Sequence, residues 1–143
     1  MKKLFTLLLF AGAFATGHAQ TVTEPLAVKE LEHNFGSIPQ GKPVYYIFEI
    51  SNTGVTPLKL DNVQASCGCT TPEWNKEPIP AGGTDKIKVG YNAASEGHFE
   101  KTVTITYNGN SSKQIIIKGD VWRAPAGSAP VNSSINFLKQ QMQ

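Results

Sequence analysis

Two cysteines, Cys67 and Cys69, flank Gly68 in a chain that has no other cysteine. In an extended strand, residues i and i+2 lie on one face about 6.6 Å apart, at the upper end of the Cα separations that a disulfide spans. Closing the pair therefore requires the backbone to curl, and Gly68 makes this curl easy because it has no side chain. A bond across so short a loop restricts the unfolded chain very little, so its effect would be on local shape or on redox chemistry.

Four kinds of chemistry remain open for Cys67 and Cys69. The first is a local disulfide that shapes the loop, which suits an exported protein. The second is metal binding, since paired thiolates suit Cu(I), whereas tetrahedral zinc needs about four ligands and only His33 and His98 remain as candidates. The others are a redox-active dithiol and intermolecular disulfides, although no basic residue or helix start flanks the pair to activate a thiol. His33 and His98 are otherwise expected in turns or on the surface.

Trp74 is the candidate binding-surface residue. It follows Pro72 in a stretch without strand alternation, so we expect it either to cover the cysteine loop as a lid or to be an exposed contact. By contrast, Tyr46, Tyr91 and Tyr107 fall on the apolar faces of predicted strands and are expected in the core.

The sequence contains no motif of an assembled active site. It has no Gly-x-Ser-x-Gly elbow, no phosphate-binding glycine loop before a helix and no His-Glu-x-x-His pair. The carboxylates are scattered along the chain and are typical of solvated strand faces. We therefore expect no enzyme, no catalytic residue and no cofactor.

The first nineteen residues have the pattern of a cleavable signal peptide. A positively charged start, an apolar run and a small-residue site follow one another over residues 1–19, which end in Gly17-His18-Ala19. An apolar run of about a dozen residues is shorter than the roughly 20 that span a membrane as a helix. We expect cleavage after Ala19, no integral membrane span after cleavage, and a periplasmic or secreted protein.

Cleavage would also make the chain electrically neutral. The full sequence has thirteen basic and eleven acidic residues, and the loss of Lys2 and Lys3 leaves eleven of each. A surface for nucleic acid or anionic lipid normally shows clustered excess lysine and arginine, and no such run occurs here. We therefore expect no nucleic-acid partner.

The rest of the chain alternates between apolar and polar residues with a period of two. The alternation predicts half-buried strands, and the short links between them, with Asn108-Gly109 as a hairpin turn, favour antiparallel pairing. About seven strands spaced near ten residues apart predict an all-β, immunoglobulin-like sandwich, with an open barrel as the alternative. The predicted strands centre on Val28–Phe35, Tyr46–Ile50, a segment that starts at Leu58, Lys86–Tyr91, Thr102–Tyr107 and Ile115–Val121.

These patterns divide the chain into four parts. After the signal peptide, residues 20–27 form an N-terminal extension and residues 28–122 form the sandwich. Residues 123–143 are rich in alanine, proline, glycine and serine near their start, which predicts a flexible C-terminal tail.

Several motifs resemble a family of short exported bacterial proteins, the domain of unknown function 1573 family. The match runs from about Glu30 to Val121, and the Cys-Gly-Cys-Thr block is its most specific part. The matching segments are His33–Gly41, Phe48–Gly54, Ser66–Pro72, Ile79–Gly82 and Gly97–Lys101. The resemblance implies a Hydin-like immunoglobulin-like domain, common in Bacteroidetes-type bacteria, and implies no activity.

We therefore expect a non-catalytic binding or structural module of the bacterial cell envelope. Its partner would be an envelope protein or polymer, contacted through exposed strand edges and the loop from Cys67 to Trp74. The alternative is a copper-binding or thiol-redox module that uses Cys67 and Cys69.

Overall fold

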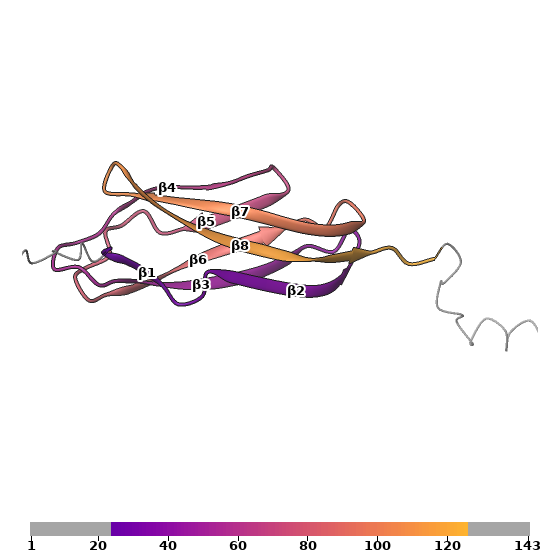
Figure 1. Ribbon diagram of the computed structural model, residues 1–143, viewed down its shortest axis with the longest axis horizontal. Helices are drawn as coiled ribbons and strands as arrows, with labels where there is room; N and C mark the ends of the chain where they lie inside the picture. The colour runs from indigo at the N-terminus through magenta and orange to yellow at the C-terminus, as the bar shows by residue number, and fades with distance from the viewer. Residues whose placement is uncertain (1–23, 126–143) are drawn as a thin grey trace, which may run out of the picture.

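The computed structural model describes residues 24–125, so the predicted signal peptide and most of the predicted tail lie outside the described residues. Within this range, all regular secondary structure is strand (Figure 1). The strands are β1 Leu26–Val28, β2 Glu32–Pro39, β3 Val44–Asn52, β4 Leu60–Ala65, β5 Thr70–Trp74, β6 Thr84–Tyr91, β7 Gly97–Tyr107 and β8 Ser111–Trp122.

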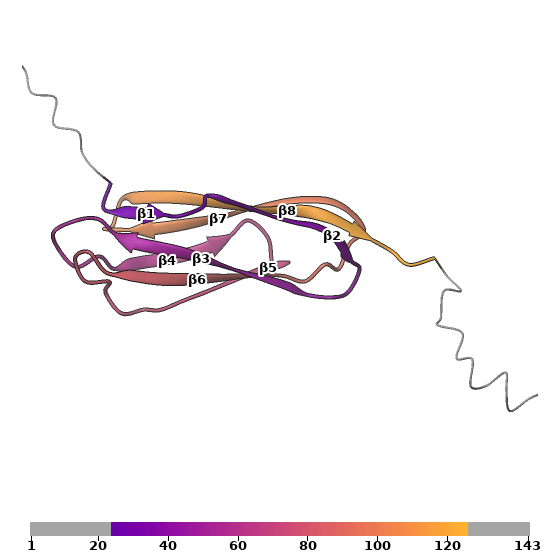
Figure 2. The ribbon, with the colours of Figure 1, turned by 90° about the horizontal axis from the view of Figure 1, so that it is seen from below.

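The strands form two layers, as the sequence predicts. One sheet, called sheet A here, has the order β1-β3-β6-β5, and the other, sheet B, has the order β2-β8-β7-β4. Figures 1 and 2 show a long sandwich in which the described chain begins at one end and leaves after β8 at the other. The immunoglobulin-like sandwich is confirmed, and the open barrel is not the observed architecture.

The core lies between the two sheets and is filled by the apolar members of the alternating strands. Tyr91 and Tyr107 are buried there, as predicted, whereas Tyr46 is only half-buried at the margin of the core. The largest fully buried side chains are Tyr107, Phe48, Leu26, Leu58, Ile87, Ile105, Ile115, Ile117, Val89, Val103 and Asn52.

The hairpin between β7 and β8 forms at the predicted turn. Asn108 and Gly109 have positive φ angles of 50° and 78°, a conformation that asparagine and glycine accept most easily. Asp61 at the start of β4 accepts a hydrogen bond of 2.8 Å from the Gly109 amide, which ties this turn to the neighbouring strand. The sequence predicted a strand that starts at Leu58, but β4 begins at Leu60. Leu58 itself forms only an isolated bridge with Ile79.

The prediction of one strand over Val28–Phe35 is wrong, because this segment is divided between two strands in different sheets. The chain forms β1 in sheet A and then crosses to sheet B, where β2 pairs with β8 in parallel. β1 begins at Leu26, two residues before the predicted start of the sandwich, because Leu26 already pairs with Asn52 of β3. Its side chain is fully buried. The crossing places Leu31 on the surface, where 53% of it is exposed.

The sequence pattern did not predict strand β5. Thr70–Trp74 pairs with β6 and forms one edge of sheet A. Its residues are mostly polar, so they show no apolar alternation, although Thr70 is buried. Pro72 fits an edge strand because proline has no amide hydrogen for a second neighbour.

Candidate functional site

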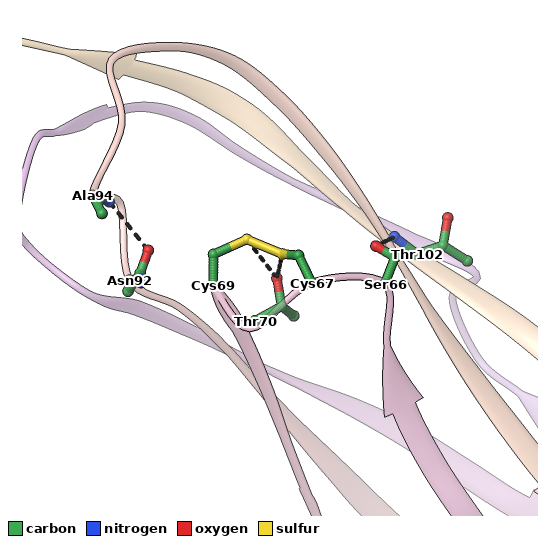
Figure 3. The surroundings of a disulfide bond; sticks show 7 residues. All are labelled: Ser66, Cys67, Cys69, Thr70, Asn92, Ala94 and Thr102. Atoms are coloured by element: carbon green, nitrogen blue, oxygen red, sulfur yellow. Dashed lines mark hydrogen bonds between the residues drawn. A yellow bond between two sulfur atoms is a disulfide. The ribbon is translucent and has the colours of Figure 1, made fainter.

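The candidate site is the crossover loop, residues 66–69, which carries the chain from β4 in sheet B to β5 in sheet A (Figure 3). The Ser66 amide donates to the Thr102 carbonyl at 2.9 Å, and the Ser66 hydroxyl accepts from the Thr102 amide at 3.3 Å. At the other side, the Asn92 amide donates to the Cys69 carbonyl at 3.0 Å. Hydrogen bonds to β7 and to the residue directly after β6 therefore hold the two ends of the loop.

Cys67 and Cys69 are joined by a disulfide in the structure. Their Cα atoms lie 5.3 Å apart, closer than in an extended strand, because the backbone curls at Gly68. The Thr70 amide closes this turn by donating to the Cys67 carbonyl at 3.3 Å. The Thr70 hydroxyl lies 3.7 Å from one sulfur and 3.9 Å from the other, as Figure 3 shows.

The loop is accessible from solvent at its tip. Cys67 and Cys69 are half-buried, and Gly68 between them is exposed. A Cβ atom built at Gly68 would meet no other atom within 4 Å. A reagent or a partner surface therefore has a clear approach to the disulfide.

Among residues 24–125, no charged side chain forms a hydrogen bond with either sulfur of the disulfide. Within that range the side-chain partner of both sulfurs is the neutral hydroxyl of Thr70. A thiolate is usually favoured by a nearby cation or a helix start. The loop therefore has a shaped surface on which the sulfurs contact a neutral hydroxyl.

Metal binding at Cys67 and Cys69 would first require reduction, because a disulfide offers no thiolate ligands. Within the part of the chain that the structure describes, no group of three or more His, Cys, Asp or Glu residues is placed to hold a metal ion. The histidines have other contacts, since His33 stacks on Tyr46 and His98 lies 3.1 Å from Asp120.

Trp74 does not lie over the disulfide loop, so the lid interpretation is wrong. It pairs with Ile87 at the far end of β5 from Thr70, and four residue steps along a strand span about 13 Å. The indole is half-buried against the core, and the Lys76 ammonium lies 3.4 Å above its ring. Its Nε1 atom is buried without a hydrogen-bond partner. A role of Trp74 in binding stays a prediction.

A second cluster, which the sequence did not reveal, joins the two sheets beside β2 and β3. The rings of His33 and Tyr46 stack 3.5 Å apart at 9°, and the Tyr46 hydroxyl donates to Glu30 at 2.6 Å. Burial lowers the pKa of His33, while the hydrogen bond to Glu30 raises the pKa of Tyr46. His33 is therefore a packed strand residue instead of the turn or surface residue predicted. The alternation of His33 and Phe35 with polar neighbours could have indicated that His33 faces inward from a strand.

Comparison with known proteins places the chain in a family. The family model described as protein of unknown function (DUF1573) matches residues 26–121. The chain belongs to this family. No curated protein of established annotation matches the sequence significantly.

Solved structures share the fold of this DUF1573 member. A protein of unknown function from Porphyromonas gingivalis W83 is 19% identical with a TM-score of 0.59, over 66% of this chain and 46% of that one. The ASH/PapD-like domain 7 of human CEP192 is 9% identical with a TM-score of 0.61, over 82% and 99% of the two chains. The secreted serine protease VesC from Vibrio cholerae is 14% identical with a TM-score of 0.55, over 80% and 25%.

These likenesses establish the sandwich fold and carry no activity with them. The chain spans just under half the length of the Porphyromonas gingivalis protein. Among the described residues, none forms a helix of the length and apolarity that crossing a membrane requires.

Proposed function

We propose that this DUF1573 protein is a non-catalytic exported module of the bacterial cell envelope that binds another envelope protein or polymer through the crossover loop. The signal-peptide pattern of residues 1–19 supports export. The observation that carries the binding role is the accessible, disulfide-closed turn at residues 67–69, which is held at both ends by neighbouring strands. A loop fixed before binding loses less conformational entropy when a partner docks.

The surroundings of the loop add exposed backbone to this surface. The loop joins β4 and β5, and each of these strands is the edge of its own sheet. Edge strands present unpaired amide and carbonyl groups, which an extended partner segment can pair with. Pro72 interrupts the donors of β5, so we expect β4 to offer the more continuous edge.

A photo-crosslinking amino acid at position 68 tests this proposal directly, because a side chain at Gly68 meets nothing within 4 Å. The matched control carries the same group at Asn110, which is exposed in the β7–β8 hairpin. In envelope preparations of the producing bacterium, we expect a discrete adduct from position 68 and none of that size from position 110. We also expect the Cys67→Ser, Cys69→Ser double variant to reduce the adduct severalfold. Equal adducts from both positions, or no adduct from position 68, would contradict the proposal.

The second candidate function is a thiol-redox or copper-binding module, which the accessibility of the disulfide favours. A partner dithiol would supply two electrons and two protons, so that the Cys67–Cys69 bond opens to two thiols and the partner dithiol closes to a disulfide. The two released thiols, as thiolates, suit a soft ion such as Cu(I).

Intact and native mass spectrometry separate the two candidates. Reversible reduction increases the mass by two hydrogens, about 2 Da, because each sulfur gains one. Under anaerobic conditions, a redox or copper module takes up one Cu(I) per reduced chain and loses it in the Cys67→Ser, Cys69→Ser variant. A reduced chain that takes up no copper, and a disulfide that cellular dithiols leave intact, would rule out this second function.

A further inference from the structure

The outer face of sheet A carries two large apolar side chains that are about half exposed. Tyr45 and Ile47, which alternate with inward residues on the central strand β3, are 56% and 49% exposed. The register places Tyr45 opposite Gly90 of β6, and Gly90 opposite Thr71 of β5. The next row on the same face consists of Ile47, Lys88 and Glu73.

The Tyr45 ring lies across Gly90. A Cβ atom at Gly90 would stand 2.8 Å from Cε1 and 2.9 Å from Cδ1 of this ring, and 3.2 Å from the Thr71 hydroxyl. A side chain at position 90 would therefore push the ring away from the sheet. Glycine at this position allows the ring to rest on the backbone while more than half of Tyr45 stays in contact with solvent.

The charges around Tyr45 are paired with each other. The Lys88 ammonium lies 4.7 Å from the Tyr45 ring centroid and 3.5 Å from the Glu73 carboxylate. Further along the face, Lys29 and Glu49 form an ion pair of 2.8 Å. A polyanion would need an excess of unpaired cations. Lys86, opposite Glu49 in the register, is one further cation on this face, and its charge also acts on the Glu49 carboxylate. The face therefore carries both signs with little excess of either, which favours an uncharged ligand that hydrogen-bonds to both.

We propose that the outer face of sheet A binds a neutral polysaccharide, with the Tyr45 ring as the stacking platform for one sugar. The C–H groups of a pyranose face would pack on the ring, and the Thr71 hydroxyl, the Glu73 carboxylate and the Lys88 ammonium would hydrogen-bond with the sugar hydroxyls. From Tyr45 to Glu49 the strand runs about 13 Å, which is enough for more than one sugar ring along β3. This inference goes beyond the proposed function, because it concerns a different surface from the crossover loop.

Affinity electrophoresis of the purified protein in native gels tests the proposal. The gels contain hydroxyethylcellulose or dextran as neutral polysaccharides, and alginate as an anionic one. We expect at least one neutral polymer to retard the protein, and Tyr45→Ala to weaken this binding about tenfold, which is ~1.4 kcal/mol. Tyr45→Phe should retain the binding because it keeps the ring. Thr104→Ala, on the outer face of sheet B, is the matched control and should leave it unchanged.

Tyr45→Leu guards against a folding effect, since leucine keeps an apolar cover on Gly90 but lacks the flat ring. A Tyr45→Leu protein that unfolds cooperatively like the wild type and loses the binding supports stacking. Retardation by neither neutral polymer, retardation by alginate alone, or neutral binding that survives Tyr45→Leu would overturn the proposal. A wild-type dimer that Tyr45→Leu converts to a monomer, seen by sedimentation, would assign the face to self-association instead. The Gly68 crosslink should be unaffected by these variants, so the two proposals fail separately.

Discussion

Asn52, at the end of β3, should be among the most costly polar residues to remove. Its side chain is 1% exposed and makes three hydrogen bonds to backbone groups. Its Nδ2 donates to the carbonyls of Thr56 at 2.7 Å and Ile79 at 2.9 Å, and its Oδ1 accepts from the Gly54 amide at 2.9 Å. Asn52 therefore joins the β3–β4 connection to the segment before β6.

The Asn52→Ala substitution leaves these three backbone groups without their side-chain partner. The Ile79 carbonyl still accepts from the Leu58 amide, so two groups, the Thr56 carbonyl and the Gly54 amide, become unsatisfied. An unsatisfied buried group costs about 1 kcal/mol or more, so the expected loss is ~2 kcal/mol in the free energy of unfolding. For a urea slope of ~1.5 kcal/mol/M, the unfolding midpoint then falls by about 1.3 M. A loss of this size is a substantial part of the roughly 5–15 kcal/mol that typically stabilises a domain.

Asn34→Ala is the matched control. The Asn34 Oδ1 also accepts from the amide two residues later, that of Gly36 at 2.8 Å, but this hydrogen bond is exposed to solvent. Water replaces the lost partner there, so we expect a loss below about 0.5 kcal/mol. Urea unfolding followed by tryptophan fluorescence measures both variants. If Asn52→Ala were no more destabilising than Asn34→Ala, the buried hydrogen bonds of Asn52 would not stabilise the fold as we infer.

Two further predictions concern packing and pH. Gly119→Ala should lower the free energy of unfolding by about 1–3 kcal/mol, because its Cβ would lie 2.8 Å from the Gly36 carbonyl oxygen and 2.9 Å from the Phe99 ring. Gly68→Ala should change the free energy of unfolding little, because there is open space around Gly68. If urea unfolding showed the same loss for Gly119→Ala and Gly68→Ala, steric crowding at Gly119 would not be the cause. Burial lowers the pKa of His33 in the folded protein, so the unfolded chain binds more protons near the ordinary value of 6.5. Stability should therefore be greatest above that value and fall as the pH decreases below it. His33→Phe, which keeps an aromatic ring beside Tyr46, should remove this part of the pH dependence, and an unchanged pH profile would show that His33 is not its source.

The sequence predicted the strands whose own residues alternate clearly. In β7, Val103, Ile105 and Tyr107 are all fully buried, as the period of two required. The Asn108-Gly109 turn was also predictable, because only a few residues accept two successive positive φ angles. These features depend on neighbours in the chain, so local patterns are sufficient to find them.

The candidate site was predictable in part. The cysteine spacing and the flanking glycine drew attention to Cys67 and Cys69, and the structure joins them. The placement of Trp74 was not predictable, because its distance from the loop follows from β5 pairing along β6. The stacking of His33 on Tyr46 and of Tyr45 over Gly90 likewise depends on which strands become neighbours.

The sequence by itself determined the cysteine pair, the predicted export signal, the family motifs and the inward face of most strands. Only the tertiary structure decided that the first strand divides between the sheets, that β5 is an edge, and that the cysteine loop crosses from one sheet to the other. The physical reason is that alternation encodes which side chains avoid water. The choice of neighbouring strand, however, depends on packing between residues that are far apart in the chain.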